Sequence, residues 1–266
     1  MADRVSIKIN DRIAEVILNR PDKFNAVDFP MWQDLADAGR QIAADTSVRA
    51  VVLHGAGSHF CSGIDVTSFQ EAGAAALQGN AMQALPDSPA NLFQEAAYIW
   101  RRVPVPVIAA LRGYVFGAGL QIAAGADIRY ATPDAKLSIM EMKWGIIPDI
   151  AITATLRNIV PIDKLKELTF TGRIIDGATA CDIGLVTGLH DDPLQAARDL
   201  ATEIAAKSPH AMRAAKKLFN DAWDDTLPAG LRLEATLQQS LMGSPNQLEA
   251  VMANLQKRPA DFRDPD

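Results

Sequence analysis

Residues 105–121, VPVIAALRGYVFGAGLQ, join an uninterrupted apolar run to a glycine-rich turn. A short apolar run such as Val105–Leu111 is typical of a strand that is buried on both faces. Glycine after a strand favours a turn into a helix, and the first N–H groups of a helix have no partner within it. The stretch therefore predicts a strand, a turn and a helix that together present backbone N–H donors.

The first half of the chain alternates strand and helix patterns. Val5–Ile9 and Ile13–Leu18 alternate in polarity around Asn10-Asp11, which predicts a β-hairpin. Val48–His54 and Asp127–Ala131 are further short apolar runs that predict buried strands. Strands separated by helices indicate parallel pairing, with ligands expected at the carboxyl ends of the strands.

Between these strands, the sequence predicts one helix and one mobile segment. Asp28 is expected to cap a helix that begins near Pro30. Four apolar residues recur on one face of that helix: Met31, Leu35, Ala38 and Ile42. The segment Glu71–Ala90 is rich in Ala, Gln and Gly, and we expect it to form a mobile lid or pocket wall.

The last third of the chain predicts mostly helices. Four segments with helical periodicity have proline near their starts: Leu194–Ala206, Ala211–Trp223, Ala229–Leu241 and Gln247–Leu255. We therefore expect an α/β core over residues 1–195, with the ligand site, and a helical region for assembly over residues 196–266.

Composition excludes several classes of function. The net charge of −6 and the lack of a dense basic stripe argue against nucleic-acid binding. No stretch approaches the roughly 20 apolar residues of a membrane span. The N-terminus lacks the apolar core of a signal peptide, so we expect a cytoplasmic protein. The four histidines are scattered without metal-ligand spacing, which predicts that no metal is bound.

Two turns could together form an oxyanion hole, a pair of N–H donors that stabilise a negatively charged oxygen. His59–Asp65 follows one predicted strand and Gly113–Gly119 follows the next, and each has glycine where a helix would begin. Plain strand–helix turns would show the same glycines. A dinucleotide fingerprint is absent, and no G-x-S-x-G motif surrounds Ser62.

Two carboxylates, Glu141 and Asp149, stand eight residues apart in the apolar run MEMKWGIIPD. A carboxylate costs free energy to remove from water, so a carboxylate with apolar neighbours is a candidate proton carrier. The alternative is that both are solvated loop charges. A turn with N–H donors followed by two carboxylates favours carbanion or enolate chemistry.

Several motifs in order resemble the crotonase (enoyl-CoA hydratase/isomerase) superfamily over nearly the whole chain. They are Asn19-Arg20-Pro21 with Asn25-Ala26, Phe60–Asp65, Gly113–Gln121, Ala126–Ala131, Leu168–Arg173 and Lys257–Phe262. The resemblance implies an α/β fold, a spiral of ββα units with a helical C-terminal trimerisation region. It also implies an acyl-CoA thioester substrate, no separate cofactor, and assembly as a homotrimer or a hexamer.

The resemblance also implies roles for individual residues. The N–H groups of Ile64 and Ala118 match the oxyanion-hole positions, although most relatives have glycine where this chain has Ala118. Glu141 and Asp149 are the expected catalytic residues. Seven positions are expected to contact the substrate or its CoA: Ala26, Ser62, Gly63, Asp65, Gln121, Lys257 and Phe262.

Gln121 is the departure that decides the predicted reaction. Hydratases of this superfamily resemble one another in having glutamates at the positions of Gln121 and Glu141, and an amide cannot replace a general acid or base. The spacing of Glu141 and Asp149 instead resembles the Δ3,5-Δ2,4-dienoyl-CoA isomerase branch, although that branch usually has aspartate at the position of Gln121. We expect Glu141 to act as base and Asp149 as distal acid. The isoleucines next to Asp149 in the sequence are expected to raise the pKa of this carboxyl.

Other functions stay open at this point. A Δ3,Δ2-enoyl-CoA isomerase would need Glu141 alone, and Asp149 would then cap a helix that begins near Ile150. An atypical enoyl-CoA hydratase is a further alternative. A non-catalytic acyl-CoA-binding protein would keep the two turns, and the retained carboxylates argue against it.

Overall fold

Residues 107–111 of the predicted strand 105–111 form β4, which lies inside a six-stranded sheet of order β1-β2-β3-β4-β6-β9. The computed structural model describes residues 4–68 and 80–265. The strands of this sheet are β1 (Val5–Asn10), β2 (Ile13–Leu18), β3 (Ala50–Gly55), β4 (Val107–Leu111), β6 (Ile128–Ala131) and β9 (Gly188–Leu189). A smaller sheet contains β5 (Tyr114–Phe116), β7 (Lys136–Ser138) and β8 (Ile175–Asp176).

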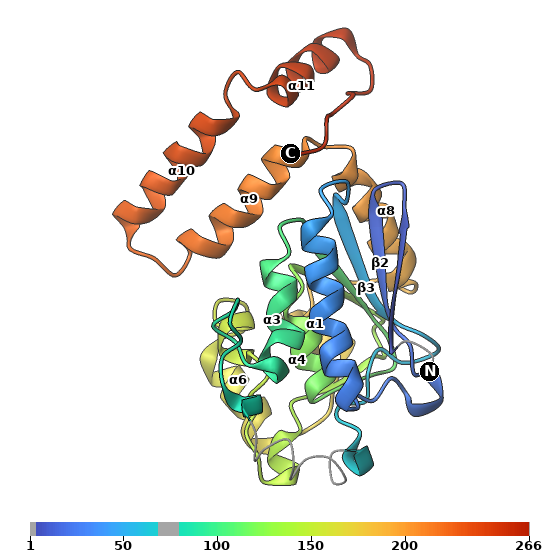
Figure 1. The fold of residues 1–266 in the computed structure, drawn as a ribbon. Coiled ribbons are helices and arrows are strands. Elements are labelled where there is room, and N and C mark those ends of the chain that lie inside the picture. Colours follow the sequence, from blue (N-terminus) through green and yellow to red (C-terminus); the bar gives the residue numbers. More distant parts are fainter. Residues whose placement is uncertain (1–3, 69–79, 266) are drawn as a thin grey trace.

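Helices cover the sheets and form the C-terminal end of the chain (Figure 1). The α-helices of the core are α1 (Phe29–Ala44), α3 (Leu92–Arg102), α4 (Ala118–Ala124), α5 (Ile152–Thr155), α6 (Ile162–Thr171), α7 (Gly177–Asp182) and α8 (Pro193–Ala205). They are followed by α9 (Pro209–Ala222), α10 (Leu227–Leu241) and α11 (Pro245–Gln256). Short 3-10 helices are η1 (Pro21–Lys23), η2 (Asn80–Met82) and η3 (Glu141–Trp144).

The predicted hairpin and the predicted parallel pairing are both confirmed. β1 and β2 pair antiparallel, and every other pair in the six-stranded sheet is parallel. The hairpin turn lies at Asp11 and Arg12, one residue later than predicted, and both have positive φ (48° and 68°). Two positive φ values match the turn whose twist suits paired strands.

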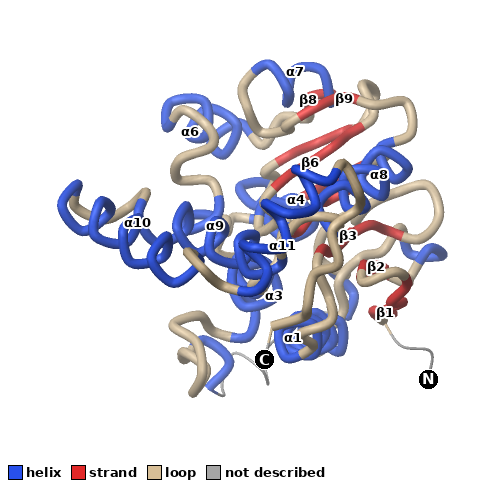
Figure 2. Tube along the Cα trace, turned by 90° about the horizontal axis from the view of Figure 1, so that it is seen from above, coloured by secondary structure: helices blue, strands red, loops and turns tan. Residues whose placement is uncertain are grey.

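The central strand β3 is buried on both faces, as its apolar sequence predicts. Val51 and Leu53 belong to the large core cluster under α1 and α3, whereas Ala50 and Val52 pack with α8. Figure 2 shows α1 and α8 on opposite sides of β2 and β3. The side-chain alternation of the strand therefore explains the layered arrangement of helix, sheet and helix.

Helix α1 confirms the predicted cap. Asp28 accepts a hydrogen bond from the N–H of Met31 (3.2 Å), and the helix begins one residue before Pro30. All four residues of the predicted apolar face are buried: Met31, Leu35, Ala38 and Ile42. These side chains join the cluster on the inner face of the sheet.

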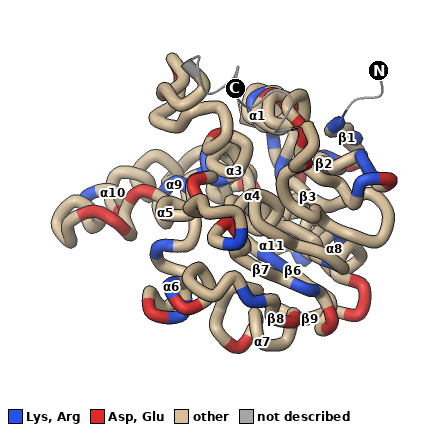
Figure 3. Tube along the Cα trace, turned by 90° about the horizontal axis from the view of Figure 1, so that it is seen from below, with Lys and Arg blue, Asp and Glu red and all other residues tan. Residues whose placement is uncertain are grey.

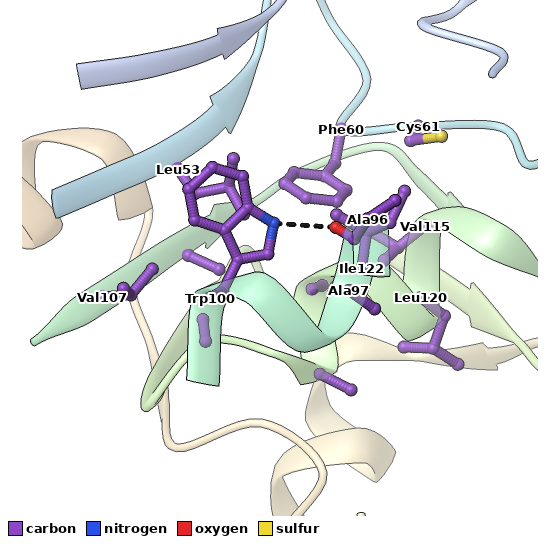
Figure 4. Close-up of a cluster of buried hydrophobic side chains, with 14 of the residues drawn as sticks. Leu53, Phe60, Cys61, Ala96, Ala97, Trp100, Val107, Val115, Leu120 and Ile122 are labelled. Carbon is purple, nitrogen blue, oxygen red and sulfur yellow. Dashed lines mark hydrogen bonds between the residues drawn. The ribbon is translucent and has the colours of Figure 1, made fainter. Parts of the chain in front are cut away.

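The same cluster supports the first of the two predicted turns. Figure 4 shows Trp100 of α3 beside Leu53 and Phe60, with Cys61 following Phe60 along the chain. The indole N–H of Trp100 donates to the carbonyl of Ala96 (3.0 Å), which satisfies its one polar group inside the core. Phe60 and Cys61 are completely buried, so the turn after β3 is held by the core itself.

The C-terminal helices α9, α10 and α11 project from the sheets (Figure 1). Lys216 of α9 is buried and donates to the carboxylate of Asp127 (2.7 Å) and to the carbonyls of Trp100 and Val105 (2.9 and 3.0 Å). The four predicted C-terminal helices are confirmed to within a few residues. The predicted division after residue 195 falls inside α8, which packs on the sheet, and the two-domain division stays a prediction.

The predicted mobile segment, the possibility of membrane spans and the distribution of charge complete the description of the fold. Residues 71–79 of the predicted mobile segment lie outside the described residues, and its remainder leads through η2 to Asn91, the cap of α3. Among the helices of the described chain, none is long and apolar enough to cross a membrane. Basic and acidic residues are interspersed along the trace (Figure 3).

Candidate active site

The two predicted turns meet at the carboxyl ends of neighbouring strands. β5 pairs parallel with β7, with Phe116 opposite Ser138, and the N–H of Gly117 donates to the carbonyl of Ser138 (2.9 Å). The first turn joins the same edge through a bridge between Cys61 and Val115. β7 ends at Ser138 and η3 begins at Glu141, so Glu141 lies three residues beyond the strand end that bonds Gly117.

A buried arginine secures the outer side of the first turn. Arg20 contacts the carboxylates of Asp65 (3.0 Å) and Asp28 (3.4 Å), and it also donates to the carbonyl of Ala26. The N–H of Asp65 donates to the carbonyl of Val27 (2.9 Å). Asp65 and Ala26 are thus linked by Arg20, and this ion pair holds the turn in register.

These segments enclose a cavity of about 330 Å³. It is lined by Ser62, Gly63, Ile64, Val66, Gly117, Ala118, Met140, Glu141, Trp144 and Ile146. Glu141 is the one ionisable side chain in this lining as described for residues 4–68 and 80–265, and most of the other lining residues are apolar or glycine. A mostly apolar cavity with one carboxylate suits an apolar ligand that exchanges a proton with that carboxylate.

Two backbone amides of this lining are available as donors. The N–H of Ile64 makes no hydrogen bond to any described residue, and Ala118 is the first residue of α4, where an N–H has no partner within the helix. Each follows a glycine with positive φ: Gly63 at 100° and Gly117 at 50°. Positive φ is open to glycine, so these two glycines permit the backbone conformation that precedes each of the two lining residues.

Glu141 is buried, with a side chain that is 4% exposed. Its Oε1 accepts a hydrogen bond from Nε2 of Gln121 (2.6 Å), and its Oε2 has no partner among the described residues. Burial raises the pKa of Glu141, the nearby charge of Asp149 raises it further, and the amide of Gln121 lowers it. A carboxyl with a raised pKa and one unoccupied oxygen can both accept and return a proton.

Asp149 is half-buried, and burial raises its pKa, as its apolar neighbours predict. The alternative role as a helix cap is wrong, because α5 begins at Ile152 with Ala151 as its cap residue and without a side-chain cap. Asp149 is not among the described residues that line the cavity. It follows the exposed Ile147 and precedes the buried Ile150, at the end of the segment that begins with Glu141.

Five of the eleven predicted site residues line the cavity: Ser62, Gly63, Ile64, Ala118 and Glu141. The other six are outside this lining, although Gln121 contacts Glu141 directly: Ala26, Asp65, Gln121, Asp149, Lys257 and Phe262. Asp65 is engaged by Arg20. The carbonyl of Phe262 accepts from Arg49 (2.8 Å), which precedes β3, whereas the cavity lies beyond the other end of that strand. Lys257 is exposed at the end of α11.

Sequence reasoning missed how Gly117 and Gln121 contact Glu141, and which side chains form the cavity wall. The wall includes Trp144 and Ile146, which are 55% and 45% exposed although both are large and apolar. Their place beside Glu141 in the sequence was the available signal. Within the described part of the chain, no group of three or more His, Cys, Asp or Glu is placed to hold a metal ion.

The chain is similar in sequence to known enzymes of one family. The sequence pattern of the family Enoyl-CoA hydratase/isomerase matches residues 8–265. The mitochondrial Delta(3,5)-Delta(2,4)-dienoyl-CoA isomerase of Mus musculus is 32% identical over 92% of this chain and 77% of its own length. A probable enoyl-CoA hydratase of Bacillus subtilis is 31% identical over 97% of this chain and 98% of its own.

Solved structures agree with the fold. A putative enoyl-CoA hydratase from Streptomyces coelicolor matches with a TM-score of 0.88 and 31% identity, over 98% of this chain and 94% of the other. The enoyl-CoA hydratase from Bacillus anthracis matches with a TM-score of 0.87 and 26% identity, over 97% and 98%. The chain therefore belongs to the enoyl-CoA hydratase/isomerase family, has the crotonase fold, and is an enzyme of acyl-CoA thioesters.

Proposed function

We propose that this enzyme is a dienoyl-CoA isomerase that moves two double bonds of a 3,5-dienoyl-CoA into conjugation with the thioester. The observation that carries the proposal is a pair of carboxyls, Glu141 and Asp149, whose pKa values are both raised by burial. The neutral Gln121 links the side chain of Glu141 to the N–H of Ile150, the residue after Asp149. Similarity to the isomerase of Mus musculus supports the same reaction.

The reaction divides into two proton transfers. The N–H groups of Ile64 and Ala118 bind the thioester oxygen, which makes the C2 proton more acidic because the negative charge of the dienolate is met by fixed dipoles. Glu141 removes the C2 proton, and the electron pair moves through the diene to C6. Asp149 delivers a proton to C6, which leaves double bonds at C2–C3 and C4–C5. Exchange of protons with water then restores both carboxyls.

The neutral amide of Gln121 argues against hydration as the main reaction. Addition of water to a 2-enoyl-CoA needs one group to activate the water and a second to protonate the α-carbon. Gln121 contacts Glu141 directly, but an amide has no titratable proton near neutral pH. The reaction proposed needs no separate cofactor, because CoA is part of the substrate.

One observation favours a second candidate. Asp149 lies outside the described lining of the cavity, whereas Glu141 is part of it. A Δ3,Δ2-enoyl-CoA isomerase carries one proton between C2 and C4 and needs Glu141 alone. For the dienoyl reaction, the bound acyl chain has to extend past Glu141 until C6 reaches the carboxyl of Asp149.

We also propose that the chain assembles as a homotrimer or hexamer through its C-terminal helices. Large apolar side chains are exposed there, including Trp223 (67%), Leu227 (77%) and Leu255 (74%). Exposed apolar groups on neighbouring helices mark a surface for protein contact. A second copy would also be the way for Lys257 or Phe262 to reach a bound CoA. The cytoplasmic location stays a prediction.

Turnover of three substrates tests the proposed reaction. The purified enzyme should convert a 3,5-dienoyl-CoA to the 2,4-dienoyl-CoA. The reaction is monitored by the rise in ultraviolet absorbance, because the double bonds of the product are conjugated with its thioester. Hydration of a 2-enoyl-CoA and isomerisation of a 3-enoyl-CoA should be slower. Faster isomerisation of the 3-enoyl-CoA would instead support the single-base reaction. Comparable hydration would show that Gln121 does not exclude water addition.

A further inference from the structure

Gln121 lies in the interior of the protein with both ends of its amide occupied. Its side chain is 0% exposed. Its Oε1 accepts from the N–H of Ile150 (2.8 Å), and its Nε2 donates to Oε1 of Glu141 (2.6 Å). A backbone N–H can only donate, so the contact with Ile150 fixes which end of the amide is oxygen. The NH2 group must therefore face Glu141.

The donor end of Gln121 determines which oxygen of Glu141 is free. An amide NH2 bound to Oε1 occupies that oxygen, and it favours the ionised form of the carboxylate. Oε2 makes no hydrogen bond to any described residue. The two oxygens of Glu141 are thus unequal, and proton transfer falls to Oε2.

The acceptor end of Gln121 holds the turn that carries Asp149. Ile150 directly follows Asp149, and the next residue, Ala151, has the left-handed conformation with φ of 57°. A residue with a Cβ adopts this conformation only at a cost, so the surrounding contacts must impose it. The hydrogen bond from Ile150 to Gln121 is one such contact, and it ties this strained turn to α4.

We propose that Gln121 is a positioning residue that clamps Glu141 and the Asp149 turn at a fixed separation, leaving Oε2 of Glu141 as the proton-transferring atom. The catalytic purpose of this separation rests on the proposed function. The two hydrogen bonds of Gln121 that form the clamp are present in the enzyme without substrate. Gln121 touches neither the cavity as described nor, by this account, the reacting carbons.

The charges around Glu141 define the expected titration. Asp149 is the one charged group of the described residues that shifts the pKa of Glu141, and it raises that pKa, as burial does. The hydrogen bond from Gln121 acts in the opposite direction. Removing the donor should therefore raise the pKa of Glu141 above its value in the parent enzyme.

Two variants separate the ends of the clamp. Gln121→Met keeps the length of the side chain and removes both hydrogen bonds. Gln121→Glu keeps an acceptor for Ile150 and replaces the donor by a second carboxyl. Asn246→Leu is the matched control, because Asn246 is also a buried amide (3% exposed) but binds the carbonyl of Arg263.

Carboxyl carbon NMR titration and amide hydrogen exchange measure the clamp without turnover, with Glu141→Gln identifying the Glu141 resonance. In Gln121→Met, the Glu141 midpoint should move to higher pH and the Ile150 amide should exchange faster. In Gln121→Glu, the midpoint should also rise, while the Ile150 amide stays protected. Asn246→Leu should change neither. Unchanged titration and exchange in Gln121→Met would overturn the proposal.

Turnover of the dienoyl-CoA adds the catalytic consequence. We expect Gln121→Met to lower kcat about 10- to 100-fold with little change in KM, because misplacing a reacting group by about 1 Å costs that much. The acid side of its pH profile should shift to higher pH. A parent enzyme without dienoyl-CoA turnover would refute the proposed function, while the titration and exchange results would still decide the clamp. An equal fall of kcat in Asn246→Leu would show that losing any buried amide lowers turnover, and that Gln121 has only a structural role.

Discussion

Gly117 lies so close to Glu141 that a Cβ placed on its backbone would be 3.3 Å from Oε1 of the carboxylate. The glycine that precedes the Ala118 amide is therefore also part of the surface against which Glu141 is seated. Its φ of 50° and ψ of −119° are open to glycine and strained for any other residue. One residue thus constrains both the Ala118 amide and the carboxylate of Glu141.

The substitution Gly117→Ala should abolish most of the activity. Its Cβ would both strain the turn and displace Glu141, so we expect kcat/KM to fall about 100-fold or more. Gly243→Ala is the control, because Gly243 also has positive φ (74°) but nothing lies within 4 Å of its added Cβ. Steady-state kinetics should show parent-like activity in the control. Equal losses in both variants would remove the role assigned to Gly117.

Glu141→Gln should make the protein more stable near neutral pH. Burial raises the pKa of Glu141, so the folded state binds its proton more tightly than the unfolded state does. The stabilisation that comes from this tighter proton binding is present in acid and is lost as pH rises through the raised pKa of Glu141. Glutamine does not ionise, so its advantage in urea unfolding should be greatest above that pKa and should shrink in acid. A difference that does not vary with pH would contradict the direction of the shift.

Glu249→Gln is a control in which the stability difference from the parent should change with pH in the opposite direction. The hydrogen bond from Arg258 to this partly exposed carboxylate lowers the pKa of Glu249 to about 2. Its contribution to stability is therefore present above the unfolded pKa and is lost as pH falls through the folded value. The variant should be less stable than the parent at neutral pH, and the difference should disappear in acid.

Lys216→Met should destabilise the docking of α9. It removes the donor of two backbone carbonyls and the cation that pairs with Asp127, whose carboxylate still accepts from the N–H of Val107. Breaking a buried ion pair from one side costs about 3 kcal/mol. Lys217→Met is the neighbouring control, since Lys217 is 59% exposed and pairs with Asp221 on the surface. There we expect a change below about 0.5 kcal/mol. Similar losses in urea unfolding for both variants would contradict this account of α9.

The apolar C-terminal helices should mediate self-association. Light scattering coupled to size exclusion should give a mass three or six times that of one chain. Trp223→Glu, or Leu227→Glu beside it, should lower the mass, because a charge on a covered surface costs free energy to desolvate. Retention of the parent's mass by both variants, or a monomeric parent at micromolar concentration, would contradict assembly through this surface.

Much of the fold follows from local patterns. The buried runs that become β3, β4 and β6 and the cap at Asp28 are encoded within a few residues of each element. The small sheet of β5, β7 and β8 did not follow from such patterns, because its strands have only two or three residues each. Such strands exist through pairing with distant segments rather than through local propensity.

Part of the cavity lining was predictable from sequence positions, whereas the contacts of Glu141 were not. Spacing indicated Glu141 and the two turns, since strand ends in a parallel sheet meet at one edge. The bonds from Gln121 span 20 and 29 residues, and no local pattern encodes them. The alternative role of Asp149 as a helix cap is excluded because α5 begins later, after Ala151 in a left-handed conformation, which alanine does not favour and sequence does not reveal.

The most direct test of the two-carboxylate mechanism compares Glu141→Gln and Asp149→Asn in turnover of a 3,5-dienoyl-CoA. Each variant removes one proton carrier with little change in shape. We predict that both rates fall by a factor of about 100 to 10,000, the range that general acid–base groups contribute. An Asp149→Asn enzyme that keeps the parent's rate while Glu141→Gln is inactive would contradict the mechanism and leave Glu141 as the single base.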